Sequence, residues 1–113
     1  MNINTPSPKD MKLCVIYRVE PGCLGPEGLM LINEFCLFAQ NNIRMNEANF
    51  IIWEIHSRSD KTLPEMEYKL NNKKLSHDKA KKYLEILDIK INELEEHFHE
   101  ELSNLVEEYF QNK

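Results

Sequence analysis

The sequence contains few glycines, no excess of basic residues and no long hydrophobic run. Only 3 of its 113 residues are glycine and 5 are proline, and the formal net charge is −5. No window holds the roughly 18 apolar residues of a membrane-spanning helix, and no basic segment precedes an apolar one at the start, so we expect neither a membrane protein nor a secreted one. A net acidic chain is poorly suited to bind nucleic acid directly, because it lacks the positive charge that neutralises phosphates.

The three cysteines do not indicate a disulfide framework, because their number is odd and no secretion signal accompanies them. We therefore expect free thiols and a cytoplasmic protein. Cys14 and Cys36 fall in apolar segments and are expected in the core.

The length of the chain suffices for one hydrophobic core. Residues 1–10 contain two prolines and few apolar side chains, so we expect a disordered arm followed by a single α+β domain over residues 11–113.

Apolar patterning in the first half predicts a βαβ unit. Residues 13–19 and 50–55 are apolar nearly throughout, which is typical of inner strands buried on both faces. Between them, apolar residues from position 29 to about position 40 recur at the spacing of a helix. Two strands joined by a helix in this way are expected to be parallel neighbours in one sheet.

The second half predicts a hairpin followed by helical structure. Residues 65–70 alternate between polar and apolar, and Asn71–Asn72 fits a tight turn before a short last strand. Ser76 is a suitable N-cap for a helix whose apolar spacing continues to Phe110. One helix of that length would extend beyond so small a domain, so we expect either a break near residues 88–92 or packing of the overhang on another subunit.

Together these elements predict an α+β fold, with helices packed on a small mixed sheet of three or four strands in the order β-α-β-β-(β)-α and a long or split C-terminal helix. The order is similar to that of thioredoxin-like folds, with Cys23 at the start of the first helix and Leu63-Pro64 before the hairpin. The resemblance implies that Cys23 is the thiol of the site and that Pro64 is a cis-proline beside it. The chain lacks the second cysteine of a CxxC pair, and residues 57–64 stand where that family has a helix.

All three glycines lie in one loop, at Gly22, Gly25 and Gly28. The loop follows a predicted strand and opens a helix, where backbone amides and the helix dipole favour anions. Cys23 lies within it, and a thiol near a helix N-terminus can ionise more readily. One hypothesis is therefore a thiolate nucleophile or an anion-binding or ligand-binding loop. The alternative is a tight connection in which the glycines only allow the turns.

The glutamates and histidines of residues 93–101 include candidate metal ligands. Helical spacing places Glu93 and His97 on one face, with His99 close by. A di-iron site would need a second Glu-x-x-His motif and further carboxylates, which the sequence lacks. We therefore expect a solvated acidic face and no cofactor. The sequence also lacks the residue order of a Ser/His/Asp triad and the HExxH spacing, which favours a non-enzymatic role.

Charge is distributed unevenly along the C-terminal half. Residues 92–108 contain seven glutamates and no lysine or arginine, whereas residues 73–82 contain five lysines and one aspartate. The two segments can be solvated faces of little energetic consequence. They can also pair with each other across two copies of the chain, or the acidic segment can imitate nucleic acid and occupy a basic partner protein.

The first predicted helix is apolar on nearly all sides, so it must be covered on more than one side. We therefore predict a non-enzymatic interaction or regulatory protein that forms a homodimer through helical surfaces. One alternative is a single-cysteine thiol protein that uses Cys23, and another is an acidic decoy for a basic, nucleic-acid-binding partner. The candidate interface residues are Met30, Leu37, Phe38, Phe98, Leu102, Leu105, Tyr109 and Phe110.

Overall fold

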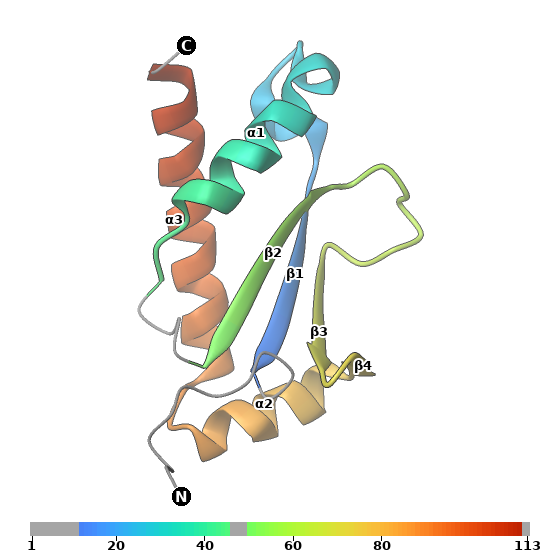
Figure 1. The fold of residues 1–113 in the computed structure, drawn as a ribbon, viewed down its shortest axis with the longest axis vertical. Coiled ribbons are helices and arrows are strands. Elements are labelled where there is room, and N and C mark those ends of the chain that lie inside the picture. The colour runs from blue at the N-terminus through green and yellow to red at the C-terminus, as the bar shows by residue number, and fades with distance from the viewer. Residues whose placement is uncertain (1–11, 46–49, 112–113) are drawn as a thin grey trace, which may run out of the picture.

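The structure, a computed structural model, describes residues 12–45 and 50–111, and the predicted N-terminal arm lies outside them. Within this part of the chain, a four-stranded sheet packs against three α-helices (Figure 1). The elements in chain order are β1 (Leu13–Val19), the short 3-10 helix η2 (Pro21–Leu24), α1 (Gly28–Asn42), β2 (Ile51–Ser57), β3 (Met66–Leu70), β4 (Lys73–Leu75), α2 (His77–Ile86) and α3 (Ile91–Gln111).

The sheet has the strand order β2-β1-β3-β4. β1 and β2 are parallel and are joined by α1, whereas β3 runs antiparallel to β1. β4 returns antiparallel to β3 through Asn71 and Asn72, whose φ angles of 58° and 65° suit a two-residue hairpin turn. The predicted α+β fold, the βαβ unit and the hairpin are therefore confirmed.

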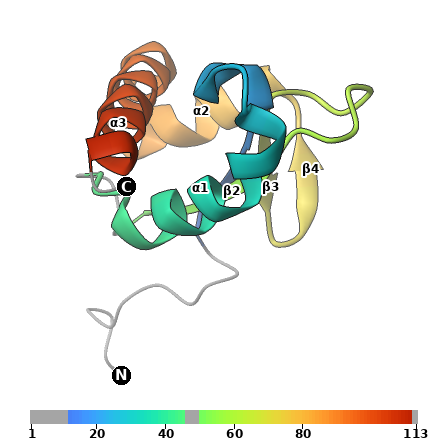
Figure 2. The same cartoon turned by 90° about the horizontal axis from the view of Figure 1, so that it is seen from above.

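The hydrophobic core lies between one face of the sheet and the three helices. Alternate residues of β1 and β2 are buried in this core, for example Val15 and Trp53. Phe35 of α1, Leu84 of α2 and Phe98 of α3 are buried in it as well. In Figures 1 and 2, α1 and α3 lie side by side near β2, whereas β4 forms the far edge of the sheet. Burial of apolar side chains between these two layers holds the domain together.

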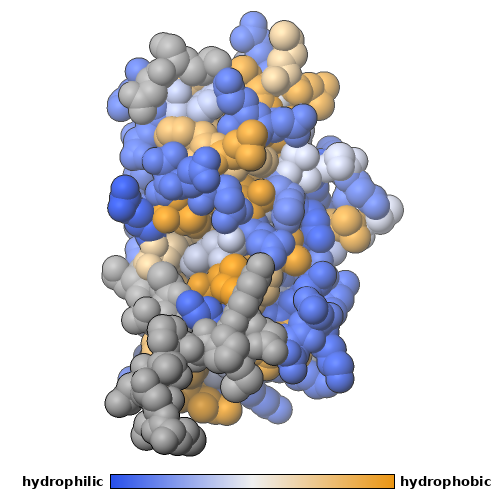
Figure 3. Space-filling view, in the orientation of Figure 1, coloured by the Kyte–Doolittle hydropathy of each residue, from blue (hydrophilic) through white to orange (hydrophobic). Residues whose placement is uncertain are grey.

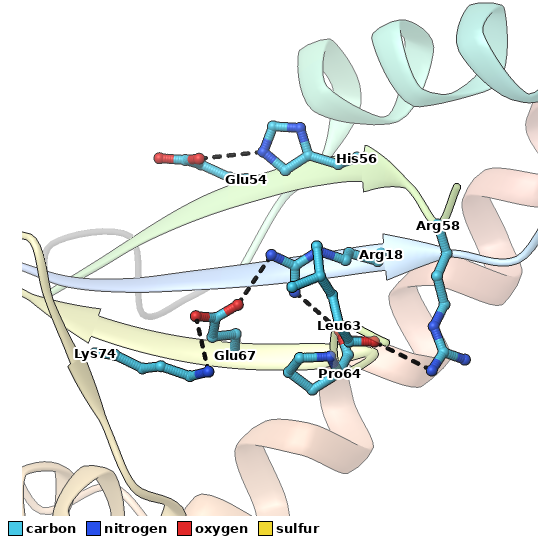
Figure 4. A network of polar contacts seen from close by, with 8 residues as sticks. All are labelled: Arg18, Glu54, His56, Arg58, Leu63, Pro64, Glu67 and Lys74. Atoms are coloured by element: carbon cyan, nitrogen blue, oxygen red, sulfur yellow. Dashed lines mark hydrogen bonds and ion pairs between the residues drawn. The ribbon is translucent and has the colours of Figure 1, made fainter. Parts of the chain in front are cut away.

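The prediction that residues 13–19 and 50–55 are buried on both faces is met only in part. β1 has five buried and two half-buried residues, with Ile16 buried on the face away from the helices, whereas in the second segment Phe50 is exposed and Ile52 and Glu54 are half-buried. Arg18, Glu54 and His56 alternate with the core residues of β1 and β2 and occupy the second face of the sheet, which the three helices leave uncovered (Figure 4). The connection between β2 and β3 accounts for this, because residues 58–65 form no helix that could pack there. A sheet face without a covering layer accommodates polar side chains at alternate positions.

The C-terminal helical segment is split into α2 and α3, so the first of the two predicted alternatives is confirmed. Asp88 has a φ of 63°, and the Ile89 amide donates a hydrogen bond to the Leu84 carbonyl at 2.9 Å. This pattern ends a helix with a residue in the left-handed conformation. At the start of α2, Ser76 Oγ accepts a hydrogen bond from the Lys79 amide at 3.2 Å, which confirms the predicted N-cap.

Both edges of the sheet are protected against pairing with another strand. At the β2 edge, the side-chain amide of Gln40 donates to the Trp53 carbonyl and accepts from the Ile55 amide, both at 2.8 Å. Gln40 thereby takes the position of a peptide group in a neighbouring strand. The opposite edge strand, β4, has three residues, two of which are lysine. Association of this protein with another chain by strand addition is therefore disfavoured.

Candidate functional site

The predicted glycine loop connects β1 to α1 and contains η2. A side chain at Gly28 would place its Cβ 1.7 Å from the Pro21 carbonyl oxygen, and Gly25 has a φ of +91°. Both positions therefore require glycine. A Cβ at Gly22 would meet nothing within 4 Å. The backbone of this tight connection accounts for two of the three glycines without a bound anion.

Cys23 is exposed in this loop, at the end of the sheet where β1 terminates. Nearby, the pKa of Tyr17 is well above its ordinary value, because burial disfavours the phenolate and the charge of Glu65, with its hydrogen bond to Tyr17, acts in the same direction. The electrostatic interaction with Cys23 also raises the pKa of Tyr17. The arrangement supplies an accessible thiol beside a protonated phenol and a carboxylate, and this negative charge does not suit a bound anion.

Alkylation near neutral pH is expected to modify Cys23 first, Cys14 more slowly and Cys36 last. Cys23 is exposed, Cys14 is half-buried and Cys36 is buried. Burial also raises the pKa of Cys36 to about 11, which leaves little reactive thiolate. Peptide mass spectrometry over a time course with iodoacetamide measures the three rates, and the same reaction in urea is the control in which the rates should converge. Native Cys36 reacting as fast as Cys23 would contradict the structure.

The site that the resemblance to thioredoxin-like folds implies is not formed. Residues 58–65 contain no helix, and every peptide bond in the described residues is trans, including the one before Pro64. Cys23 is a free thiol, as are the other two cysteines. The implied pairing of a reactive cysteine with a cis-proline is therefore not formed.

Two arginines fix the connection between β2 and β3 (Figure 4). Arg58 lies 2.6 Å from the Glu20 carboxylate and also donates to the Leu63 carbonyl at 3.2 Å. Arg18 donates to the Pro64 carbonyl at 2.9 Å. These contacts tie the loop to the end of β1.

The uncovered sheet face carries a chain of ion pairs. Glu67 on β3 lies 2.9 Å from Arg18 on β1 and 3.7 Å from Lys74 on β4 (Figure 4). Burial raises the pKa of Glu67, but the hydrogen bond and charge of Arg18, together with the charges of Lys74 and Lys69, lower it by more. The carboxyl group is therefore ionised at neutral pH. This face is a charged layer rather than an apolar docking surface.

A hollow of about 440 Å³ lies on the same face. Within it, Cys14 Sγ donates to Glu54 Oε2 at 3.3 Å. The other oxygen of this carboxylate, Oε1, lies 3.2 Å from Nε2 of His56, which is outside the lining of the hollow. The expectation that Cys14 belongs to the core is wrong, because its side chain is on the uncovered face of β1. The hollow is lined by Lys12, Cys14, Ile16, Ile52, Glu54, Lys69, Asn71 and Asn72.

The candidate metal ligands Glu93, His97 and His99 all lie on α3. The His99 ring contacts the Tyr17 ring edge-on, with centroids 5.7 Å apart. In residues 12–45 and 50–111, no group of three or more histidine, cysteine, aspartate or glutamate side chains is arranged to hold a metal ion.

The acidic segment lies on α3, whereas the basic segment spans β4 and the start of α2. Glu101 of α3 is half-buried and accepts a hydrogen bond from the Arg44 backbone amide at 3.1 Å. The other charged residues of the predicted pairing face solvent, so they can meet either a basic partner or a second copy. They are Lys79, Lys81 and Lys82 of α2 and Glu100, Glu107 and Glu108 of α3.

The candidate interface residues differ in how far the chain itself buries them. Four of those on α3 are buried in the chain's own core, because α3 packs its apolar stripe on the sheet and on α1; they are Phe98, Leu102, Leu105 and Tyr109. Phe38 is half-buried, with its ring 5.6 Å from that of Tyr109. Three candidates are well exposed, namely Met30 (84%), Leu37 (69%) and Phe110 (42%). Leu29 is 82% exposed, although the apolar spacing of the sequence did not identify it as a surface residue.

The solvent side of α1 carries exposed apolar side chains together with polar ones. Among its 15 residues the helix has one charged side chain, Glu34, which is exposed. The Glu34 carboxylate accepts a hydrogen bond from the Tyr109 hydroxyl, which holds this charge on the side of α1 that faces α3. Figure 3 shows hydrophobic side chains at the surface near the start of α1. We call Leu29, Met30, Asn33 and Leu37 the α1 face.

Within the described residues, none of the helices combines the length and the apolar character that crossing a membrane requires. Comparisons with family models, curated proteins and solved structures give no match for this chain.

Proposed function

We propose that this protein is a non-enzymatic interaction or regulatory protein that forms a homodimer through the α1 face. The observation that supports this most directly is the exposure of Leu29, Met30 and Leu37 on one uncharged helix face. The centres of protein interfaces are depleted of charged residues and enriched in methionine. Full burial of each of these side chains would contribute roughly 1.5–3 kcal/mol before the cost of association.

The other surfaces suit self-association less well. Gln40 and the short, lysine-bearing strand β4 protect the sheet edges. The uncovered sheet face bears the ion pairs of Glu67, and the solvent side of α3 is acidic. Because each copy has a formal charge of −5, two copies repel each other overall. The α1 face allows close approach without bringing like charges together.

A cytoplasmic location is part of the proposal, and no cofactor is needed for the proposed role. The three free cysteines support this location, because disulfides form and persist mainly in oxidising compartments.

Light scattering coupled to size-exclusion chromatography tests the homodimer. At tens of micromolar, wild-type protein is expected to elute as a dimer and Leu37→Asp as a monomer, because the new carboxylate would be buried without a partner. Ile86→Asp on α2 is the matched control, since Ile86 is 81% exposed on another helix, and this variant should remain a dimer. Circular dichroism checks that both variants fold. A monomeric wild-type protein in both low and high salt would overturn the proposal.

A further inference from the structure

We infer that the two copies pair their α1 helices antiparallel, across a two-fold axis that passes beside Asn33. The inference rests on the proposed homodimer and adds the geometry of its contact and the role of one polar side chain.

The α1 face has an internal symmetry that suits this arrangement. Asn33 is exposed and lies between Leu29 and Leu37, four residues from each. At a rise of 1.5 Å per residue, the two leucines lie about 6 Å from Asn33 in opposite directions along the helix. A two-fold axis at Asn33 therefore places Leu29 against the partner's Leu37, with Met30 beside this contact, and the same contact repeats on the other side. Apolar side chains thus meet at both ends of the contact.

Asn33 is the polar centre of the pairing. A carboxamide has both a donor and an acceptor, so two symmetry-related Asn33 side chains can satisfy each other when water is excluded. A single asparagine in a helix–helix contact fixes the register at some cost in affinity. A shift of one turn in either direction would place each Asn33 against Leu29 or Leu37 of the partner.

The dipole of α1 favours the antiparallel direction over the parallel one. The helix has no acidic residue in its first turn and no basic residue in its last turn. The N-cap residue Glu27 is acidic but makes no capping hydrogen bond through its side chain, so it alone acts against the positive end, and no side chain offsets the negative end. Antiparallel packing brings the positive end of each helix close to later turns of the other, whereas parallel packing places like ends together.

The contact is small, so the dimer should dissociate on dilution. Stable interfaces bury about 800 Å² on each partner. One face of a single helix covers less than this, so we expect a dimer in equilibrium with its monomer.

Disulfide cross-linking tests the geometry. Asn33→Cys is introduced in a Cys23→Ser background, which removes the exposed native thiol. With dissolved oxygen as the oxidant, antiparallel pairing should give a covalent dimer, because the introduced thiols face each other beside the two-fold axis. Asn41→Cys in the same background is the matched control, since Asn41 is also exposed on α1. Antiparallel pairing separates the two thiols introduced at position 41 by about 24 Å, too far for a disulfide.

A second pair of variants covers the case in which Asn33→Cys weakens the dimer. Leu29→Cys protein is mixed with Leu37→Cys protein, both in the Cys23→Ser background. Antiparallel pairing predicts mixed disulfides between the two variants, and parallel pairing predicts disulfides within each variant alone. Mass spectrometry of the cross-linked species distinguishes the two results.

The inference is supported if position 33 cross-links and position 41 does not, or if mixed disulfides dominate between positions 29 and 37. Equal cross-linking at positions 33 and 41, disulfides only between identical variants, or no cross-link in any variant of a protein that scatters light as a dimer would overturn the antiparallel geometry and leave the homodimer standing. A monomeric wild-type protein would overturn both.

Discussion

Replacing Gly28 with alanine is expected to destabilise the protein by on the order of 4 kcal/mol, which is large for a substitution that adds one methyl group. Gly28 is buried at the start of α1. The added Cβ would lie 1.7 Å from the Pro21 carbonyl oxygen and 2.6 Å from its carbon. Both are backbone atoms, so relief of the clash requires η2 and the first turn of α1 to move apart, and the packing between them is lost.

The other two glycines of the same loop provide matched controls. Gly22→Ala has open space and should change the free energy of unfolding by less than about 0.5 kcal/mol. Gly25→Ala has space but keeps a φ of +91°, so it should cost an intermediate amount, about 1–3 kcal/mol. Urea unfolding monitored by the fluorescence of Trp53, the single tryptophan, measures all three variants. Equal stability of the alanine variants at positions 22 and 28 would show that the close approach to Pro21 does not exist.

Replacing Phe98 with alanine is expected to reduce the free energy of unfolding by about 3–5 kcal/mol. Phe98 is fully buried between α3 and the sheet. Its ring stacks on Trp53, with centroids 4.7 Å apart and planes 8° from parallel, and also lies 4.8 Å from the Tyr17 ring. Removing the ring leaves a cavity that the two neighbouring rings, each held on a strand, cannot fill.

Phe110→Ala is the matched control, because Phe110 lies on the same helix and is 42% exposed. It should cost less than about 1 kcal/mol. The comparison also separates the core role of Phe98 from the subunit contact that its sequence pattern predicted. If Phe98 formed a subunit contact, Phe98→Ala would dissociate the dimer and leave the unfolding midpoint of dilute protein unchanged. That result, measured by urea titration and light scattering, would contradict the structure.

Local signals in the sequence were sufficient to predict most of the fold. Asn71–Asn72 indicated a hairpin because asparagine tolerates positive φ, and Ser76 indicated a helix start because its hydroxyl can cap a free amide. The glycines at positions 25 and 28 indicated a tight connection, because glycine allows a positive φ, as at Gly25, and a close approach of the backbone, as at Gly28. Each of these features depends on the conformation of a few consecutive residues.

The candidate site was predicted less well, because its residues interact across large sequence separations. Cys14 and Glu54 lie on different strands and meet only when β1 and β2 pair in register. Gln40 closes the β2 edge through contacts with residues 13 and 15 positions away. Leu29 and Leu37 have the same apolar character as buried leucines, so their exposure depends on how α1 rotates against the sheet and α3.

The helices, strands and turns can be predicted from the amino-acid sequence, because backbone preferences, caps and apolar periodicity act over short distances. Which surfaces each element covers depends on how the elements pack. A stripe such as that of Phe98 and Leu105 must be removed from water, but the hydrophobic effect has no direction and does not specify whether the sheet of the same chain or another subunit covers it. Here the stripe of α3 packs in the core of the same chain. The connection between β2 and β3 contains no helix, so one face of the sheet carries charged residues. The α1 face has no charged residue and stays in solvent.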